Sequence, residues 1–373
     1  MRNYMLFYNG NQRLTTITLF KEIPSKDIVA ALNYPTMVVI LMTLNQVMSD
    51  SLNIYHIRKN TGLPVKIIVD YSMEGCVNID DLRGLGRFGG FGGVEVDDMM
   101  FVHNSGMKHQ NTETIRNNFY IDFHAVDAYN KCILRGHPLN KTPVSERTNG
   151  LNLLIGKIKA KNSRFLTTYY FYKYGLLDNA VLGIHAYPED FKLMMKKHSI
   201  DDEGFYNKIL TCLGPADNAD LADTNEGLST MDGWPYDPNI FNRSSVSYIC
   251  ETYDVDKGTI ILNTEKFYRS ITNRHPFIAQ AAPGYMKKVK AIGYETFSSI
   301  IDEGYNDYDD KLDLSHVEPT VIAAKDLLSK VPGNTEKLQE IVDHNFNHFM
   351  KTSEAEYQSF LNAVDNFASG RLI

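Results

Sequence analysis

The stretch Ile261–Phe297, ILNTEKFYRSITNRHPFIAQAAPGYMKKVKAIGYETF, decides the fold of this chain. Its pattern predicts a helix that begins at Thr264, followed by the strand HPFIAQAA. A turn at Pro283 and Gly284 then leads into a helix closed by Gly293 and into the short strand YETF. Strands and helices that alternate in this way are typical of parallel strands joined by crossover helices. The stretch therefore predicts an α/β domain.

Apolar runs earlier in the chain predict further strands. TMVVILMTLNQ begins at Thr36 and PVKIIVDYS begins at Pro64, and both are β-rich runs that end in polar residues, as strands buried on both faces do. MMFVHNSG, from Met99, predicts another strand, and SVSYICETY, from Ser245, predicts one that ends near Glu251. The first part of the chain is therefore also expected to be mixed α/β.

Composition limits the class of protein. With 373 residues, 43% of them hydrophobic, the chain can form two domains or one large one. Its net charge of -7 argues against a protein coated in nucleic acid, although it leaves room for a local basic face. The 4 cysteines lie far apart, which favours a reduced, cytoplasmic compartment. No run approaches the roughly 20 apolar residues that span a bilayer, so no membrane partner is expected.

The triplet Thr264–Lys266 has the composition of a phosphate site. A nucleotide diphosphate leaving group needs positive charge and oriented backbone donors, which a helix N-terminus with a lysine in its first turn supplies. Thr264 would cap the helix, Lys266 would reach a phosphate, and Glu265 would accept from ribose hydroxyls, with Glu251 lining the same cleft. The alternative is a capped surface helix whose Glu and Lys face water, and the spacing leaves both open.

The order of these motifs resembles the nucleotide-binding half of GT-B glycosyltransferases, and TEKF is similar to a segment of the inverting α-1,3-fucosyltransferases. The segment from Val246 to Asp310 resembles still more a group of phage-encoded glycosyltransferase-like proteins. In that group a TEK helix, an HPF strand, a Pro-Gly turn and an acidic DE-YD segment follow in order. IDEGYND matches the acidic segment, with Asn306 in place of the expected Asp. The resemblance implies that Lys266 and Arg164 bind the donor phosphates and that Glu265 holds the ribose.

The resemblance also implies a domain plan. We expect an α/β protein with two Rossmann-like domains facing a cleft, GT-B-like, with mostly parallel sheets. Residues 1–145 would form the N-terminal acceptor-side domain and residues 146–352 the C-terminal nucleotide-sugar-binding domain. Residues 353–373 would form a C-terminal helix, capped by Thr352 or Ser353, that packs back on the N-terminal domain.

The catalytic base is sought in the opposite domain. Inverting transfer needs a carboxylate or histidine that takes the acceptor proton. Asp70 and Glu74, after the VKIIV run, are the candidates, and the alternative is that they only cap the next element. His103, His124 and His275 are more typical of structural histidines. The glycine loop over residues 84–93 would contact donor or acceptor, or would be a mobile loop. No metal and no cofactor is expected, and the acidic segment at residues 302–313 is interpreted as a solvated turn.

Basic residues in one segment raise a possible DNA partner. Lys157, Lys159, Lys161 and Arg164 would follow a DNA backbone, with tyrosines 169, 170 and 172 for stacking, or they would form a solvated helix face. We therefore expect a glycosyltransferase that moves a sugar from a nucleotide diphosphate sugar to a hydroxyl, such as that of a hydroxymethylated base in phage DNA. It would act in the cytoplasm, that of the host if a phage encodes it. The alternatives are an inactive glycosyltransferase-like binding or assembly protein, and a glycosyltransferase that modifies glycans or proteins.

Overall fold

The computed structural model places part of the chain well enough for description. It describes residues 4–8, 37–43, 65–71, 99–104, 118–130, 132, 136, 139–148, 150–158, 161–185, 187–213, 241–251, 263–308 and 314–368. The chain divides into two compact units: the first contains residues 1–131 and 352–373, and the second contains residues 132–351. Residues 132–145, expected in the N-terminal domain, therefore belong to the second unit.

The first unit contains a parallel sheet. Its strands pair in the order β1-β2-β3-β4-β5. They are β1 (Tyr4–Tyr8), β2 (Met37–Thr43), β3 (Val65–Tyr71), β4 (Met99–Asn104) and β5 (Asn118–Ile121). Four successive side chains of β4, Met99 to Val102, are buried. Because successive side chains point to opposite faces, this strand is covered on both faces, as its apolar run predicts.

The strand order of the first unit is sequential. Each of the described strands β2 to β5 pairs with the strand that precedes it in the chain. A Rossmann-like sheet instead reverses its strand order near the middle. The parallel pairing is as expected for these five strands, but their order lacks the reversal that the Rossmann-like interpretation of the N-terminal domain requires.

Helix α13 (Thr335–Ala368) contributes its last turns to the first unit. Phe360 lies with its ring centroid 5.8 Å from that of Phe119 on β5. Tyr357 lies 6.2 Å from Tyr129 on helix α5 (Phe123–Tyr129). Aromatic packing therefore holds the end of α13 against β5 and α5. The helix begins at Thr335, so the prediction that it starts near residue 353 with a Thr352 or Ser353 cap is wrong. No Gly or Pro interrupts residues 335–352, and the helix runs through them.

The second unit contains a four-stranded parallel sheet whose strand order reverses. The order is β7-β6-β8-β9. The strands are β6 (Leu151–Lys157), β7 (Ala180–His185), β8 (Val246–Cys250) and β9 (Phe277–Gln280). From β6 the chain first goes to one side of the sheet and then returns to the other, so the reversal lies between β6 and β8. This is a Rossmann-like sheet, and ligands of such sheets bind at the carboxyl ends of the strands beside the reversal.

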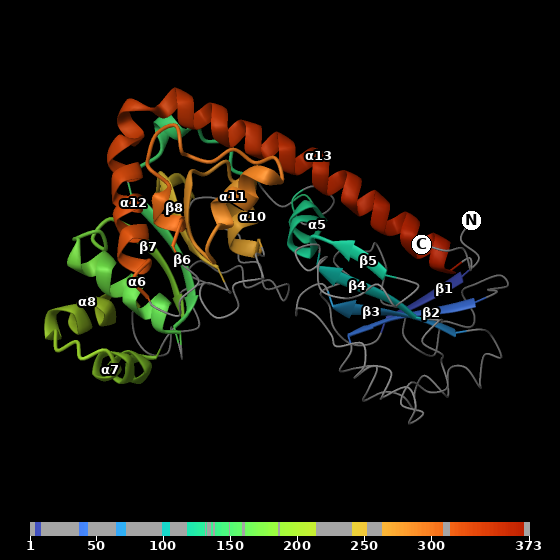
Figure 1. Ribbon diagram of the computed structural model, residues 1–373, viewed down its shortest axis with the longest axis horizontal. Coiled ribbons are helices and arrows are strands. Elements are labelled where there is room, and N and C mark those ends of the chain that lie inside the picture. Colours follow the sequence, from blue (N-terminus) through green and yellow to red (C-terminus); the bar gives the residue numbers. More distant parts are fainter. Residues whose placement is uncertain are drawn as a thin grey trace. The chain divides into compact units, whose positions relative to one another are not determined.

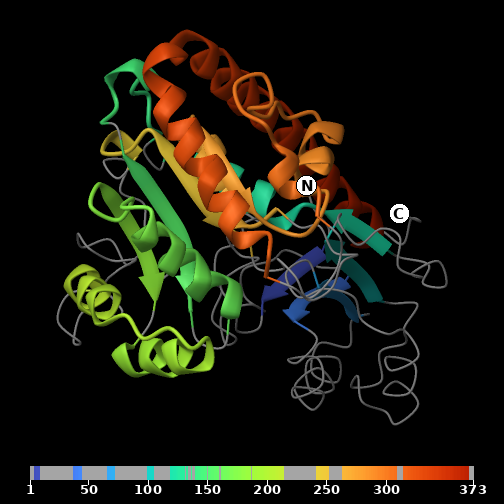
Figure 2. The same ribbon diagram turned by 60° about the vertical axis from the view of Figure 1, so that its left-hand side comes forward.

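Helices cover both faces of this sheet (Figures 1 and 2). Helices α6 (Asn162–Lys173) and α12 (Val317–Lys330) pack together on one face. The other face carries α10 (Glu265–Thr272), α11 (Tyr285–Ala291) and the first half of α13. Helices α7 (Pro188–Lys197) and α8 (Glu203–Leu213) lie between β7 and β8 in the chain. Short 3-10 helices are η4 (Val144–Glu146), η6 (Gly304–Asn306) and η7 (Val331–Gly333).

The deciding stretch folds almost as its sequence predicts. The ring of Phe267 on α10 packs edge-on against Phe277 of β9, Tyr285 of α11 and Tyr294, at centroid distances of 5.3, 6.3 and 5.2 Å. Gly293 closes α11 with φ of 98°. YETF is not a strand, however. Its backbone binds side chains instead, because Asn345 of α13 accepts from and donates to the backbone of Glu295.

No helix among the described residues has both the length and the apolar surface that crossing a membrane requires.

Candidate functional site

The candidate site lies where the strand order of the second unit reverses. Strand β6 ends at Lys157, and neighbouring β8 is followed by Glu251. The pairing of β6 with β7 shifts register between Leu154 and Gly156, which marks a bulge at the end of β6. Bulges of this kind redirect side chains and the chain path, and they are enriched beside active sites.

Gly156 brings two cationic side chains together. Its φ is 74°, in the left-handed region that favours glycine. A Cβ at this position would lie 3.1 Å from Arg164 Nη1 and 3.5 Å from Lys266 Cε. The guanidinium group of Arg164 and the end of the Lys266 stem, which come from helices on opposite faces of the sheet, therefore both lie against the backbone at Gly156.

Arg164 comes from the first turn of α6 and is 5% exposed. Its Nη2 donates to the backbone carbonyl oxygen of Glu251 at 3.4 Å. This contact ties α6 to the end of β8. The structure thus puts Arg164 beside Lys266, as the resemblance implies, and buries it instead of exposing it on a helix face.

Lys266 is buried at the start of α10, with 9% of the residue exposed. Its Nζ donates to Glu265 Oε1 at 2.7 Å, and the two side chains are 11% and 32% exposed. The alternative of a lysine that faces bulk water does not describe this residue. The buried ammonium group of Lys266 thus pairs with the carboxylate of Glu265 and lies near the guanidinium group of Arg164, and its charge also acts on the buried carboxyl group of Glu251.

Thr264 caps α10, as its sequence position predicts. Its Oγ1 accepts from Lys266 N at 3.3 Å. The same residue binds Glu251 twice, through its backbone N–H to Oε1 at 3.1 Å and through its hydroxyl to Oε2 at 2.5 Å. The end of β8 therefore fixes the orientation of the first backbone amides of α10.

Glu251 is buried directly after the end of β8. It is 1% exposed, and the Tyr285 hydroxyl also donates to its Oε1, at 3.2 Å. Burial raises the pKa of this carboxyl group, an effect that the charge of Lys266 and the hydrogen bonds from Thr264 partly offset. Both carboxylate oxygens accept hydrogen bonds from the protein, and through them Glu251 holds Thr264; its expected contact with a donor stays a prediction.

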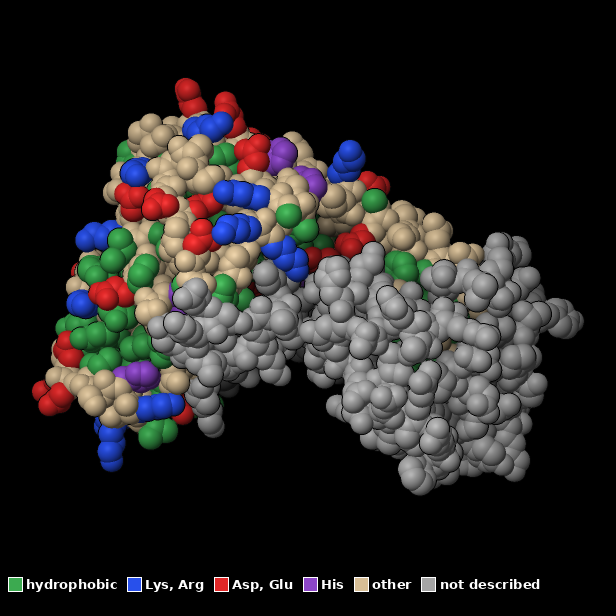
Figure 3. Space-filling model, in the orientation of Figure 1, with side chains coloured by type: hydrophobic (Ala, Val, Ile, Leu, Met, Phe, Trp, Pro, Cys, Tyr) green, Lys and Arg blue, Asp and Glu red, His purple; other side chains and the backbone are tan. Residues whose placement is uncertain are grey.

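The acidic segment after α11 is a cap. Asn306 Oδ1 accepts from Met286 N at 2.9 Å, and its backbone carbonyl oxygen accepts from Gly284 N at 3.1 Å. Figure 3 shows Lys and Arg side chains over α11 with carboxylates among them. Two lysines of α11 form ion pairs with the acidic segment: Lys290 with Glu303 and Lys287 with Asp307, both at 2.9 Å. Asn306 thus fixes the turn before Tyr285, and within the described ranges no His, Cys, Asp and Glu cluster forms a metal site.

No family model matches this chain, and no curated protein matches it. The site is therefore interpreted from its own geometry.

Several predicted site residues lie outside what the structure describes. Glu74, Lys159 and the glycine loop over residues 84–93 fall in this group. For Asp70, His103 and Lys157 the structure describes the backbone alone. Asp70 stands near the carboxyl end of β3, in register with Thr43 of β2 and Val102 of β4. The catalytic roles of Asp70 and Glu74 stay predictions.

His275 is structural, as expected. Its Nδ1 lies 2.8 Å from Ser247 Oγ, and its Nε2 lies 2.8 Å from the carbonyl oxygen of Ser244. Complete burial, together with the charge of Arg147, lowers its pKa to about 3. The imidazole is therefore buried and held by hydrogen bonds within the protein. His124 is likewise buried, on α5.

The tyrosines proposed for base stacking have partners within the protein. The carboxylate of Glu318 accepts from Tyr174 OH at 2.6 Å and from Lys173 Nζ at 3.1 Å. The ring of Tyr170 lies 5.8 Å from that of Tyr169, and the ammonium group of Lys173 lies 5.3 Å from the centroid of the Tyr170 ring. The rings of Tyr169 and Tyr172 each pack 5.3 Å from Phe205 on α8. This face of α6 is thus built into the contacts with α8 and α12. Lys161 precedes α6 and is half-buried.

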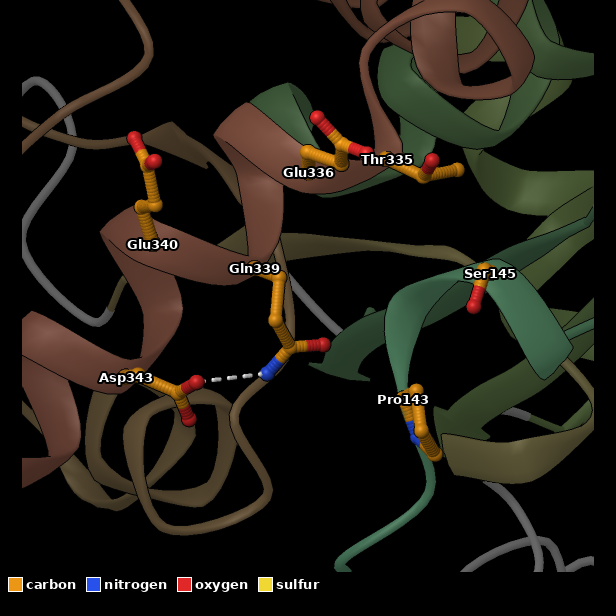
Figure 4. Close-up of a pocket in the computed structure, with 7 residues that line it drawn as sticks. All are labelled: Pro143, Ser145, Thr335, Glu336, Gln339, Glu340 and Asp343. Atoms are coloured by element: carbon orange, nitrogen blue, oxygen red, sulfur yellow. Dashed lines mark hydrogen bonds between the residues drawn. The ribbon is translucent and has the colours of Figure 1, made fainter.

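A pocket of about 430 Å³ lies between η4 and the first turns of α13 (Figure 4). Its lining residues are Pro143, Ser145, Thr335, Glu336, Gln339, Glu340 and Asp343. Three of these are carboxylates. A negatively charged lining repels a diphosphate, so this pocket is not assigned to a nucleotide sugar.

Two residues of the site were missed by the sequence interpretation. Gly156 is a single glycine inside an apolar strand, a pattern that indicates a bulge or a close approach of the backbone. Tyr285 follows the Pro-Gly turn, and nothing in its local sequence connects it to Glu251, 34 positions earlier. The sequence pattern around Gly156 could therefore have indicated its role, whereas the role of Tyr285 depends on tertiary structure.

Proposed function

We propose that this chain is a glycosyltransferase whose Arg164 and Lys266 bind the diphosphate of a nucleotide sugar. One observation carries the proposal: a buried Arg and a buried Lys both lie against the backbone at Gly156, at the reversal of strand order in a parallel sheet. Parallel sheets of this topology bind their ligands there.

The chemistry of the group suits a departing diphosphate. Negative charge builds on the leaving group as the glycosidic bond to it breaks, and fixed cations at that position lower the barrier. The guanidinium of Arg164 offers planar donors, and the ammonium of Lys266 offers a compact charge. Helix α10 adds oriented backbone amides at its N-terminus, which Thr264 and Glu251 hold in place.

The cost of burial supports a functional interpretation. Removing a cation from water is unfavourable unless it is paired and hydrogen-bonded, and two cations side by side also repel each other. The side chain of Lys266 is 11% exposed and its ion-pair partner is the more exposed Glu265. A ligand that carries two phosphates would neutralise both cations together.

The remaining parts of the proposal concern the first unit. In a GT-B-like arrangement it would supply the acceptor side and the general base, and Asp70 or Glu74 would take the proton from the acceptor hydroxyl. The acceptor that we propose is a hydroxymethylated base of phage DNA, flipped out of the duplex if the DNA is double-stranded. Lys157, Lys159 and Lys161 are the proposed contacts to the DNA backbone.

A donor screen tests the activity. Purified protein is mixed with UDP, GDP and ADP sugars, and binding is measured by calorimetry and by thermal shift. The proposal requires binding of at least one donor, and Lys266→Met must weaken it. Lys287→Met is the matched control, because Lys287 lies on α11 with a side chain that is 75% exposed. If no donor binds, the proposal is wrong.

A transfer assay tests the acceptor. Labelled donor is incubated with phage DNA that carries hydroxymethylated bases and, separately, with host polysaccharide and protein. Label in digested nucleosides supports the DNA acceptor, and label in the polysaccharide or protein assigns a different acceptor. A chain that binds donor but transfers nothing to any of them is the inactive binding protein.

A further inference from the structure

Glu251 is a buried acid next to the proposed diphosphate site. It is 1% exposed, and Thr264 and Tyr285 donate hydrogen bonds to its carboxylate. The hydroxyl of Thr264 donates to Oε2, and the oxygen of the same hydroxyl accepts from Lys266 N at 3.3 Å. A single hydroxyl group therefore joins the carboxylate to the first turn of α10, where the diphosphate is proposed to bind.

The negative charge of this carboxylate opposes the binding of an anion. Burial raises the pKa of Glu251, whereas the charge of Lys266 and the hydrogen bonds from Thr264 lower it. Titratable groups around it come from three helices of the described structure: Lys266 and Glu265 on α10, Tyr285 on α11 and Arg164 on α6. A diphosphate bound to Lys266 would cancel the positive charge that favours the ionised carboxylate, and it would add negative charge nearby. Ligand binding therefore favours the protonated form of Glu251.

We propose that Glu251 takes up a proton when the diphosphate of the donor binds, and that the hydroxyl of Thr264 then donates to the ligand. This inference rests on the proposed function. The proton comes from solvent and binds to Oε2 of Glu251. The protonated Oε2 donates to Thr264 Oγ1, so the hydrogen of the Thr264 hydroxyl is released from the carboxylate and bonds a phosphate oxygen. No covalent bond of the ligand forms or breaks in this step.

The proton on Glu251 also suits the reaction. The departing diphosphate carries more negative charge than the diphosphate of the intact nucleotide sugar, so a neutral Glu251 becomes more favourable as transfer proceeds. An ionised Glu251 would repel the leaving group at the moment when its charge builds. The buried acid thus adjusts its charge to that of the ligand.

The coupling between proton and ligand has a definite sign. Because the ligand binds the protonated form more tightly, the pKa of Glu251 is higher in the complex than in the free protein. Affinity for the donor should therefore be highest at low pH, fall as the pH rises between these two pKa values, and stay constant above them. The alternative is that Glu251 stays ionised throughout and only holds Thr264. Binding would then bring no proton to this group.

The test measures the proton uptake that accompanies donor binding. The ligand is the nucleotide sugar that wild type binds best among UDP, GDP and ADP sugars. Neither of its phosphates titrates near neutral pH, because each is esterified and bridged to the other. Calorimetry in buffers of different ionisation enthalpy gives the uptake from about pH 5 to about pH 9, and wild type should take up as much as about one proton where its affinity falls.

Two variants and a control assign that proton. In Glu251→Gln the amide oxygen can accept the bonds that Oε1 accepts, and the amide nitrogen can donate to Thr264 Oγ1 as the protonated acid would. This variant should take up no proton and, at about pH 9, should bind the donor roughly tenfold more tightly than wild type. Tyr285→Phe removes a donor that stabilises the ionised form, so uptake should move to higher pH. Glu340→Gln, with a side chain that is 70% exposed on α13, should match wild type.

The outcomes separate this inference from the proposed function. Uptake that Glu251→Gln loses and Glu340→Gln keeps supports the inference. If a nucleotide sugar binds wild type without uptake at any pH, or with the same uptake in Glu251→Gln, the proton coupling is wrong while the proposed function stands. If circular dichroism shows that Glu251→Gln is unfolded, Tyr285→Phe decides, and an unchanged pH range of uptake contradicts the inference. If no nucleotide sugar binds wild type, the proposed function fails and the inference fails with it.

Discussion

Thr264 binds the carboxylate of Glu251 with both its backbone amide and its hydroxyl, at 3.1 and 2.5 Å. This double contact joins the end of strand β8 to the start of helix α10. Tyr285 donates to the same carboxylate, and Asn306 holds the turn before Tyr285. The orientation of the amides at the N-terminus of α10 thus depends on a chain of buried hydrogen bonds that reaches residues 55 positions away in sequence from Glu251.

Replacing Thr264 with Val should destabilise the protein. Valine has the same shape but lacks the hydroxyl that caps α10 and that binds Glu251, so the free energy of unfolding should fall by roughly 2–4 kcal/mol. Thr264→Ser keeps the hydroxyl and should lose clearly less. Urea denaturation followed by circular dichroism compares the three proteins. Equal losses in both variants would mean that the hydroxyl contributes nothing.

Replacing Gly156 with Ala should weaken diphosphate binding. The φ of 74° costs an L-residue about 1–2 kcal/mol, and the new Cβ would lie 3.1 Å from Arg164 Nη1 and displace it. Gly175→Ala is the matched control, because Gly175 has φ of 67° and no atom within 4 Å of its added Cβ. Both variants should lose stability to a similar degree, whereas only Gly156→Ala should lose affinity for nucleoside diphosphates in calorimetry. A similar loss of affinity in Gly175→Ala would contradict this interpretation.

Glu356 should make the stability of the protein depend on pH. Burial, together with the neighbouring Asp122, raises its pKa from 4.5 to about 7. The folded state therefore binds this proton more tightly than the unfolded state, so stability falls as the pH rises from about 4.5 to about 7 and stays lower above that range.

Glu356→Gln should remove that loss. Glutamine resembles the protonated acid and keeps an oxygen to accept from Asp122 N, a bond of 3.1 Å in the wild type. The free energy of unfolding at pH 8 should rise by up to roughly 3 kcal/mol, with little change at pH 4. Glu354→Gln, at an exposed position on the same helix, is the control. Denaturation curves across this pH range would contradict the assignment if wild type and Glu356→Gln ran parallel.

Much of the fold could be predicted from sequence because its signals are local. Thr264 and Gly293 mark the start of α10 and the end of α11 by cap chemistry, and the apolar runs of β2, β3 and β4 mark strands by composition. The failures came from tertiary structure. YETF has strand-like composition, but Asn345 of α13 satisfies its backbone. The start of α13 was misplaced because Thr352 and Ser353 are good cap residues that the helix nevertheless incorporates.

The sequence predicted which residues form the candidate site better than it predicted the contacts that each of them makes. Lys266, Thr264 and Arg164 were expected together, and the structure brings them together at the strand reversal. Glu251 was expected to line the cleft, a role that stays a prediction; its three hydrogen bonds to Thr264 and Tyr285 could not be predicted from the sequence, because they depend on tertiary contacts. The order of the strands could not be read from their sequences, because β6 and β8 pair across a separation that no local pattern records.

The central claim is that Arg164 and Lys266 together bind a nucleotide diphosphate. The most direct measurement is isothermal calorimetry of UDP, GDP and ADP with wild type, Lys266→Met and Lys287→Met. The account predicts that one nucleotide binds wild type and Lys287→Met equally and binds Lys266→Met at least about tenfold more weakly. Equal affinity of all three proteins for that nucleotide, or no binding to wild type, would contradict it.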